Sequence, residues 1–176
     1  MECSGWPRLV AGRSGPAALV ANLPYNIATP LVVRVLEEAP SIGRLFVMVQ
    51  REVGERWVAR PGDPAYGAVS VKIAYWSQAT VAGRVPPTVF VPRPKVDSVL
   101  VSLVRRPAPA VDPAVVDYRR FETVVRAGFA QRRKMLRRSL AGLVTPAAFA
   151  AAGVAPSARA EELDVVAWGA LAREHK

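Results

Sequence analysis

The pattern of hydrophobic and polar positions divides the chain into an alternating first part and a helical second part. Runs of consecutive apolar residues at 17–21 and 45–49 are typical of strands buried on both faces. Between them, residues 29–39 carry apolar side chains at helical spacing, after a Thr29-Pro30 start that is typical of a helix N-terminus. The same criteria predict, in chain order, a helix at 52–59, a helix at 67–78, and strands at 80–85 and 98–104. This alternation predicts an α/β protein with a parallel sheet covered on both faces.

A segment rich in Pro and Ala at 107–113 marks the expected domain boundary, because this composition is typical of linkers. We therefore expect an unstructured leader at 1–14, an α/β domain at 15–106 and a helical domain at 114–176. Within the helical domain, the apolar spacing predicts helices at 118–143, 146–152 and 160–174.

Composition narrows the function classes. The 176 residues include 24 Lys and Arg against 14 Asp and Glu, a formal net charge of +10. This excess favours a polyanionic partner, above all nucleic acid, although charge alone also serves solubility. Cys3 is the only cysteine and His175 the only histidine, which leaves little material for a disulfide, a metal site or a Ser–His–Asp triad. No apolar run reaches the roughly 18 residues that a membrane span needs, so we expect a cytoplasmic protein without metal or membrane.

The placement of the charge is more informative than its sum. On a helix over 118–143, the apolar side chains share one face and a stripe of cations occupies the opposite face. These cations are Arg119, Arg120, Arg126, Arg133, Lys134, Arg137 and Arg138. No acidic residue alternates with them, which favours contact with a phosphate backbone over the alternative of an ordinary solvated face. Arg132 projects toward the apolar face, and we expect it to pair with a carboxylate at the edge of the core or to snorkel.

The sharpest local motif is Asn22-Leu23-Pro24-Tyr25, directly after the first apolar strand. Ligands of open α/β sheets bind at the carboxyl ends of strands, so the motif lies where a site is expected. A side-chain amide oxygen, a free carbonyl in a rigid turn and an aromatic face suit the amino group of a planar base. The alternative, which four residues alone favour, is a strand-ending turn with a packed Tyr25.

The longer stretch Asn22-Leu23-Pro24-Tyr25-Asn26-Ile27 resembles the fourth motif of the S-adenosylmethionine-dependent ribosomal RNA small-subunit adenine dimethylases, the dimethyladenosine transferase family. Three further groups of residues resemble motifs of the same family and follow one another in the family's order. The first is 50–53 with 61–62 and 66–67, the second is 85–90 with 92–98, and the third is 129–136 with 159–163. The resemblance runs from about Gly15 to the end of the chain. It implies the C-terminal half of a Rossmann-like methyltransferase sheet at 15–106, followed by a small all-α RNA-binding domain.

The resemblance also implies an activity and a set of site residues. The family uses S-adenosylmethionine to dimethylate two adjacent adenines near the 3′ end of small-subunit rRNA, in the immature small ribosomal subunit. By resemblance, Tyr25 and Phe90 stack on the target base, Asn22 and the Pro24 carbonyl accept hydrogen bonds from its amino group, and Leu23 completes the motif. Of the residues that contact the cofactor in the family, the resemblance assigns only Asn22 in this sequence.

The family's glycine-rich loop and its two acidic cofactor contacts have no counterpart before Asn22. We therefore expect a truncated chain that alone binds the cofactor weakly or not at all and does not methylate. One alternative is a non-catalytic RNA-binding remnant of the family, which cofactor binding would distinguish. Another is a DNA adenine or protein-glutamine methyltransferase, whose related motif usually has Pro where Leu23 stands, so Leu23 and the rRNA-type C-terminal domain count against it.

Overall fold

The structure is a computed structural model that describes residues 17–24 and 26–174. These residues form two compact units. The first contains the described residues up to Val58 together with Trp76–Pro107, and the second contains Ala59–Tyr75 together with the described residues from Ala108 onward. Residues 59–75 therefore pack with the C-terminal helices, whereas the sequence prediction placed them in the α/β domain.

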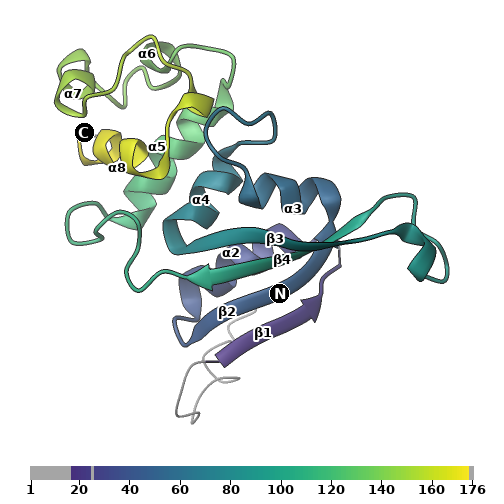
Figure 1. Cartoon of the computed structure of the whole chain (residues 1–176). Helices are drawn as coiled ribbons and strands as arrows, with labels where there is room; N and C mark the ends of the chain where they lie inside the picture. Colours follow the sequence, from purple (N-terminus) through teal and green to yellow (C-terminus); the bar gives the residue numbers. More distant parts are fainter. Residues whose placement is uncertain (1–16, 25, 175–176) are drawn as a thin grey trace. The chain divides into compact units, whose positions relative to one another are not determined.

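The first unit is built on a four-stranded sheet with the order β1-β2-β4-β3 (Figure 1). Its strands are β1 (Ala17–Asn22), β2 (Ile42–Gln50), β3 (Ser77–Val85) and β4 (Ser98–Arg105). β1 and β2 are parallel, but β4 is antiparallel to both of its neighbours, so the prediction of an all-parallel sheet is wrong. The connection between β3 and β4 holds only the short 3₁₀ helix η1 (Pro87–Val89), whereas the crossover of a parallel pair usually contains an α-helix.

Two helices, α2 (Ala28–Glu38) and α3 (Arg51–Val58), cover one face of the sheet. The two helices are joined by a hydrogen bond in which Trp57 Nε1 donates to Thr29 Oγ1 over 3.1 Å. α3 approaches the sheet very closely, because a Cβ atom at Gly54 would lie 2.3 Å from Cγ2 of Val99. The core beneath these helices is made by alternate residues of β2 and β4, namely Leu45, Val47, Val49, Val99, Val101 and Leu103.

The opposite face of the sheet keeps apolar side chains exposed. Val20 of β1 and Phe46 of β2 are neighbours in register and are 73% and 39% exposed. Val104 of β4 is also exposed. No helix within residues 17–24 and 26–174 buries these side chains, so the prediction of a sheet covered on both faces is wrong for the described chain.

Arg105, the last residue of β4, ties the sheet to the end of α2. Its guanidinium donates to the carbonyl oxygens of Val35, Leu36, Ala39 and Ile42 over 2.8–3.2 Å. The last carbonyls of a helix have no partner within the helix, so a cation placed there satisfies them and complements the helix dipole. Partial burial lowers the pKa of this guanidinium.

The second unit is helical. It contains α4 (Ala68–Trp76, whose last residue belongs to the first unit), α5 (Tyr118–Ala130), α6 (Leu136–Ser139), α7 (Pro146–Ala151), η2 (Ala160–Glu162) and α8 (Val165–Arg173). The ring of Tyr75 on α4 packs 4.8 Å from that of Phe121 on α5. α5 and α8 pack so closely that a Cβ atom at Gly128 would lie 2.3 Å from the Trp168 ring.

The helix predicted over 118–143 is interrupted. α5 ends at Ala130, residues 131–134 form a turn, and Met135 pairs with Arg159 in an isolated antiparallel bridge. Residues 129–141, which span the interruption, contain no Gly or Pro that would break a helix, so tertiary contacts override local propensity. The predicted helix 160–174 is also divided, because Asp164 accepts a hydrogen bond from the Ala167 amide and begins α8.

Candidate functional site

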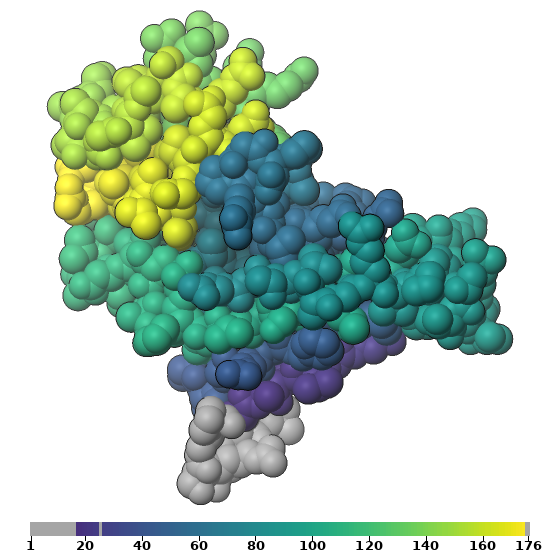
Figure 2. Space-filling model, in the orientation of Figure 1, coloured from purple at the N-terminus to yellow at the C-terminus, as the bar shows by residue number. Residues whose placement is uncertain are grey.

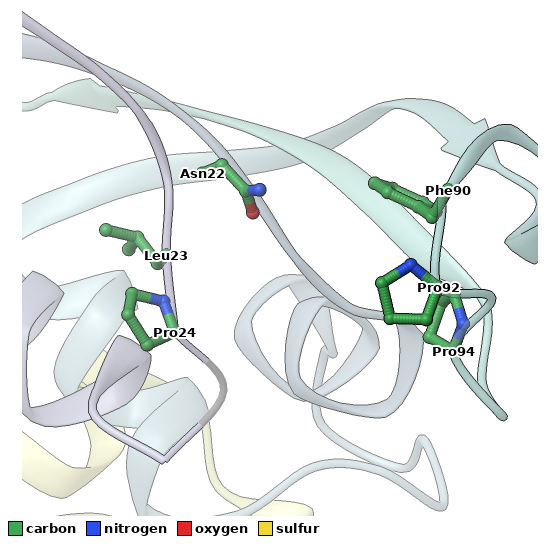
Figure 3. Close-up of a pocket in the computed structure, with 6 residues that line it drawn as sticks. All are labelled: Asn22, Leu23, Pro24, Phe90, Pro92 and Pro94. Atoms are coloured by element: carbon green, nitrogen blue, oxygen red, sulfur yellow. The ribbon is translucent and has the colours of Figure 1, made fainter.

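The carboxyl end of β1 and the connection between β3 and β4 meet at a cleft of about 320 Å³. Figure 3 shows Asn22 and Phe90 on opposite sides of this cleft, with the Phe90 ring directed toward Asn22. The residues that line it are Asn22, Leu23, Pro24, Phe90, Pro92 and Pro94. Two motifs that lie far apart in the sequence therefore converge on one cleft.

The first motif leaves β1 in a fixed turn. Asn22 is exposed, and its side-chain amide makes no hydrogen bond to another described residue. The Leu23 amide donates to the Met48 carbonyl over 3.1 Å, and the Leu23 side chain is buried. The Pro24 carbonyl accepts a hydrogen bond from the Ile27 amide over 3.2 Å, which leaves its second lone pair for another donor. Tyr25, the fourth residue of the motif, lies outside the described residues.

The second motif lies on residues 86–97, which we call the 86–97 connection. Phe90 is half-buried, and its amide donates to the Pro87 carbonyl over 3.3 Å. The far end of the connection is anchored to the first residue of α3. The Arg51 amide donates to the Asp97 carbonyl over 2.9 Å, and Arg51 Nη1 donates to Asp97 Oδ2 over 2.9 Å. These contacts anchor the end of the segment that carries Phe90 beside the start of α3.

The chemistry that the cleft offers is neutral. Among the described lining residues the polar groups are the Asn22 amide and backbone atoms, and neither a carboxylate nor a cation is present. Two oxygen acceptors beside an aromatic ring suit a planar ligand with an amino group. Nowhere in residues 17–24 and 26–174 do three His, Cys, Asp or Glu side chains gather as metal ligands would. No helix in these residues is long and apolar enough to cross a membrane.

The seven predicted RNA-contacting cations do not form one helical stripe, because α5 ends before the last four. Arg119 and Arg126 are exposed on α5, but the Arg120 side chain is half-buried and donates to the Arg173 carbonyl over 2.9 Å at the end of α8. The other four are exposed in the turn and on α6. We call this group the basic turn, and it consists of Arg133, Lys134, Arg137 and Arg138.

Arg132 follows the prediction made for it. Its Nε donates to Glu161 Oε2 over 2.7 Å, and its Nη2 donates to the Pro64 carbonyl over 3.0 Å. The expected pairing with a carboxylate is therefore confirmed. The bridge between Met135 and Arg159 also brings the exposed Arg159 beside the basic turn. Periodicity within 118–143 could not reveal this cation, because it comes from a distant loop.

Solved structures define the class of this fold. The crystal structure of the 23S rRNA methyltransferase ErmE matches 92% of this chain and 66% of its own, with a TM-score of 0.68 and 27% sequence identity. The crystal structure of a dimethyladenosine transferase from Plasmodium falciparum matches 91% of this chain and 67% of its own, with a TM-score of 0.72 and 21% identity. The first unit thus has the Rossmann-like fold of rRNA methyltransferases.

Sequence comparison identifies the family. The family described as Ribosomal RNA adenine dimethylase matches residues 13–175, and the chain belongs to this family, as predicted. The protein named Ribosomal RNA small subunit methyltransferase A from Streptomyces griseus is 49% identical over 177 residues, which cover 96% of this chain. Its counterpart from Xanthomonas campestris is 46% identical over 157 residues, which cover 89% of this chain. The chain spans about 59% of the length of these relatives.

Proposed function

We propose that this chain provides the target-base site and the RNA-contacting helices of an S-adenosylmethionine-dependent rRNA adenine N6-dimethyltransferase. Its substrate is small-subunit rRNA, as the names of the matched relatives suggest. The family resemblance adds that this rRNA is bound in the immature ribosomal subunit. The observation that carries the proposal is the convergence of the Asn22-Leu23-Pro24 strand end and Phe90 on one neutral cleft.

The cleft residues bind and orient the base. An adenine that leaves its stack can enter a pocket, where the amino group becomes accessible. Phe90 stacks on the base, and Tyr25 is expected to do the same. Asn22 Oδ1 and the Pro24 carbonyl accept the two amino hydrogens, which directs the nitrogen lone pair out of the ring plane. Positioning of this kind is a main source of rate acceleration in group transfer.

The cofactor is only partly accounted for by the described residues. S-adenosylmethionine supplies an electrophilic methyl group when it is bound. Asn22, at the end of β1, can contact it beside the base. The hydroxyls of its ribose are good partners for carboxylates, and none of the described cleft residues is acidic. The cleft therefore fits the target adenine better than the nucleoside part of the cofactor, and we derive no transfer step from this chain alone.

The basic turn provides affinity for the RNA backbone. Its four cations are exposed, and residues 123–160 contain no acidic side chain. Each phosphate that such cations neutralise releases counterions, so the binding constant falls as salt rises. Charge reversal of Arg133, Lys134 and Arg137 to Glu should weaken RNA binding and flatten its salt dependence. Unchanged affinity would assign these cations to an ordinary solvated surface.

The base site is tested with two hairpin RNAs that differ in one functional group. One contains adenine at the target position, and the other contains purine riboside, which lacks the amino group. Two neutral hydrogen bonds of about 0.5–1.5 kcal/mol each contribute about 1–3 kcal/mol together, which predicts roughly a five- to 150-fold preference of the wild-type chain for adenine. The Asn22→Ala variant should lose part of this preference. Equal affinity of the wild-type chain for both hairpins would contradict the proposed base site.

A second candidate is an RNA-binding protein of the same family without catalysis. The lack of an acidic side chain among the described cleft residues favours it. The two functions are distinguished by transfer of a labelled methyl group from S-adenosylmethionine to undermethylated small subunits. Transfer by the 176-residue chain supports the enzyme, whereas adenine-selective RNA binding without transfer supports the second candidate.

A further inference from the structure

The 86–97 connection has a second side that the cleft does not use. Phe90, Pro92 and Pro94 line the cleft, while the residues between and before them face solvent. Val91 is 100% exposed and Val89 is 62% exposed. Figure 1 shows the connection between β3 and β4 projecting beyond the sheet, and Figure 2 shows a teal protrusion of the surface at the same place. The same short segment therefore presents an aromatic ring to the cleft and two valines to solvent.

The exposed valines lie on a stiff support. The connection contains Pro86, Pro87, Pro92 and Pro94, each of which fixes its own φ angle near −65°. The ion pair and the backbone hydrogen bond between Arg51 and Asp97 anchor its far end. Apolar side chains held outward on a restrained backbone lose little conformational entropy when a partner covers them.

The charged side chains nearest to these valines along the chain are cations. Residues 64–96 contain no Asp or Glu, and the exposed cations of the β3–β4 hairpin are Arg84, Arg93 and Lys95. Lys95 lines a second cleft, of about 250 Å³, together with Arg51, Glu52 and Asp97. The two carboxylates there are paired with Arg56 and Arg51 respectively, and Lys95 makes no ion pair within the described chain.

We propose that the outer side of the 86–97 connection is an RNA contact that supports extrusion of the target adenine. Val91, with Val89 beside it, packs against the bases next to the extruded one, and Arg93 and Lys95 bind the flanking phosphates. An apolar side chain against an opened base step offsets part of the cost of unstacking. RNA is the occupant that this side fits, because the opposite side of the segment lines the base cleft and the exposed charges on it without an ion pair among the described residues, Arg93 and Lys95, are positive. The inference rests on the function proposed above.

The charge arm of the test compares single reversals in the full chain. Arg93→Glu and Lys95→Glu are compared with Arg44→Glu, an exposed cation near the amino end of β2, away from the cleft at the carboxyl end of β1. Each phosphate contact contributes about −0.7 to −0.9 to the slope of log K against log salt concentration. Loss of one contact therefore lowers the affinity at 0.1 M salt roughly five- to eightfold, relative to 1 M salt. We expect this loss for Arg93→Glu and Lys95→Glu, and a smaller one for Arg44→Glu.

The apolar arm uses a hairpin with 2-aminopurine beside the target adenine, whose fluorescence reports loss of stacking. Val91→Ser should reduce the fluorescence change on binding at least twofold, while the control Val166→Ser, also at an exposed valine, leaves it unchanged. If the wild-type chain binds no hairpin, the proposed function fails and this inference fails with it. If the wild-type chain binds, but the Arg93 and Lys95 variants match Arg44→Glu or Val91→Ser matches Val166→Ser, only this inference is overturned.

Discussion

The contact between Arg105 and the end of α2 gives a prediction whose size can be worked from the structure. Arg105→Met keeps the aliphatic stem and removes four hydrogen bonds, to the carbonyls of Val35, Leu36, Ala39 and Ile42. A hydrogen bond to a charged group contributes about 1.5–3 kcal/mol, but Arg105 is only half-buried and water replaces part of each bond. We expect the free energy of unfolding to fall by about 3 kcal/mol, which is near the contribution of one fully buried hydrogen bond to a charged group. For a chain of this size, that lowers Tm by about 6–12 °C.

The matched control is Arg84→Met, because Arg84 is exposed on β3 and makes no hydrogen bond or ion pair among the described residues. Thermal melts followed by circular dichroism measure the stability, and hydrogen exchange locates the effect at the last turn of α2. Arg105→Lys should retain less than half of the stabilisation, because one ammonium cannot reach four carbonyls. Equal melting temperatures for Arg105→Met and Arg84→Met would refute the role assigned to these hydrogen bonds.

Three further predictions concern both units. The Tyr66 hydroxyl is buried and donates to the Leu163 carbonyl over 2.7 Å, and this burial raises its pKa. The folded state therefore keeps a proton that the unfolded state loses above about pH 10. The free energy of unfolding should therefore fall as pH rises past about 10. Tyr66→Phe should remove part of this fall and lower the free energy of unfolding at neutral pH by about 1–2 kcal/mol. Thermal melts at neutral and alkaline pH measure both effects. Gly54→Ala should lower stability by about 1–3 kcal/mol in urea unfolding, because its Cβ would lie 2.3 Å from Val99 Cγ2; an unchanged midpoint would mean that α3 shifts freely. Phe90→Ala should weaken binding of the adenine hairpin by about 1–3 kcal/mol, whereas Phe90→Tyr keeps the affinity; equal titration curves for both variants would exclude stacking.

The sequence predicted local features better than long-range pairing. The apolar run at 17–21 corresponds to β1, although Val20 on it is exposed in the described chain. The helical spacing at 29–39 corresponds to α2, because this pattern follows directly from burial of one helix face. The direction of β4 could not be predicted in this way, since the same apolar run suits a parallel or an antiparallel partner. The end of α5 at Ala130 was also not predictable, because it depends on contacts with distant residues such as Glu161 and Arg159.

The candidate site needed more than periodicity. Asn22 at a strand end was a reasonable candidate from position alone, but only the family resemblance connected it with Phe90. The structure adds Pro92 and Pro94 to the cleft and shows that Leu23 is buried, so its side chain serves packing as well as the motif. Arg120, by contrast, belongs to the charge pattern in the sequence but is engaged at the end of α8.

The exposed apolar face around Val20 and Phe46 has a practical consequence for handling the protein. A net charge of +10 keeps the molecules apart at low ionic strength, and salt screens this repulsion within about 8–10 Å at 0.1–0.15 M. Sulfate and phosphate also strengthen association of apolar surfaces. The high salt that dissociates bound nucleic acid during purification thus also screens the electrostatic repulsion that prevents precipitation. High salt removes RNA but lowers the solubility of the protein, so purification should use a moderate chloride concentration and no sulfate.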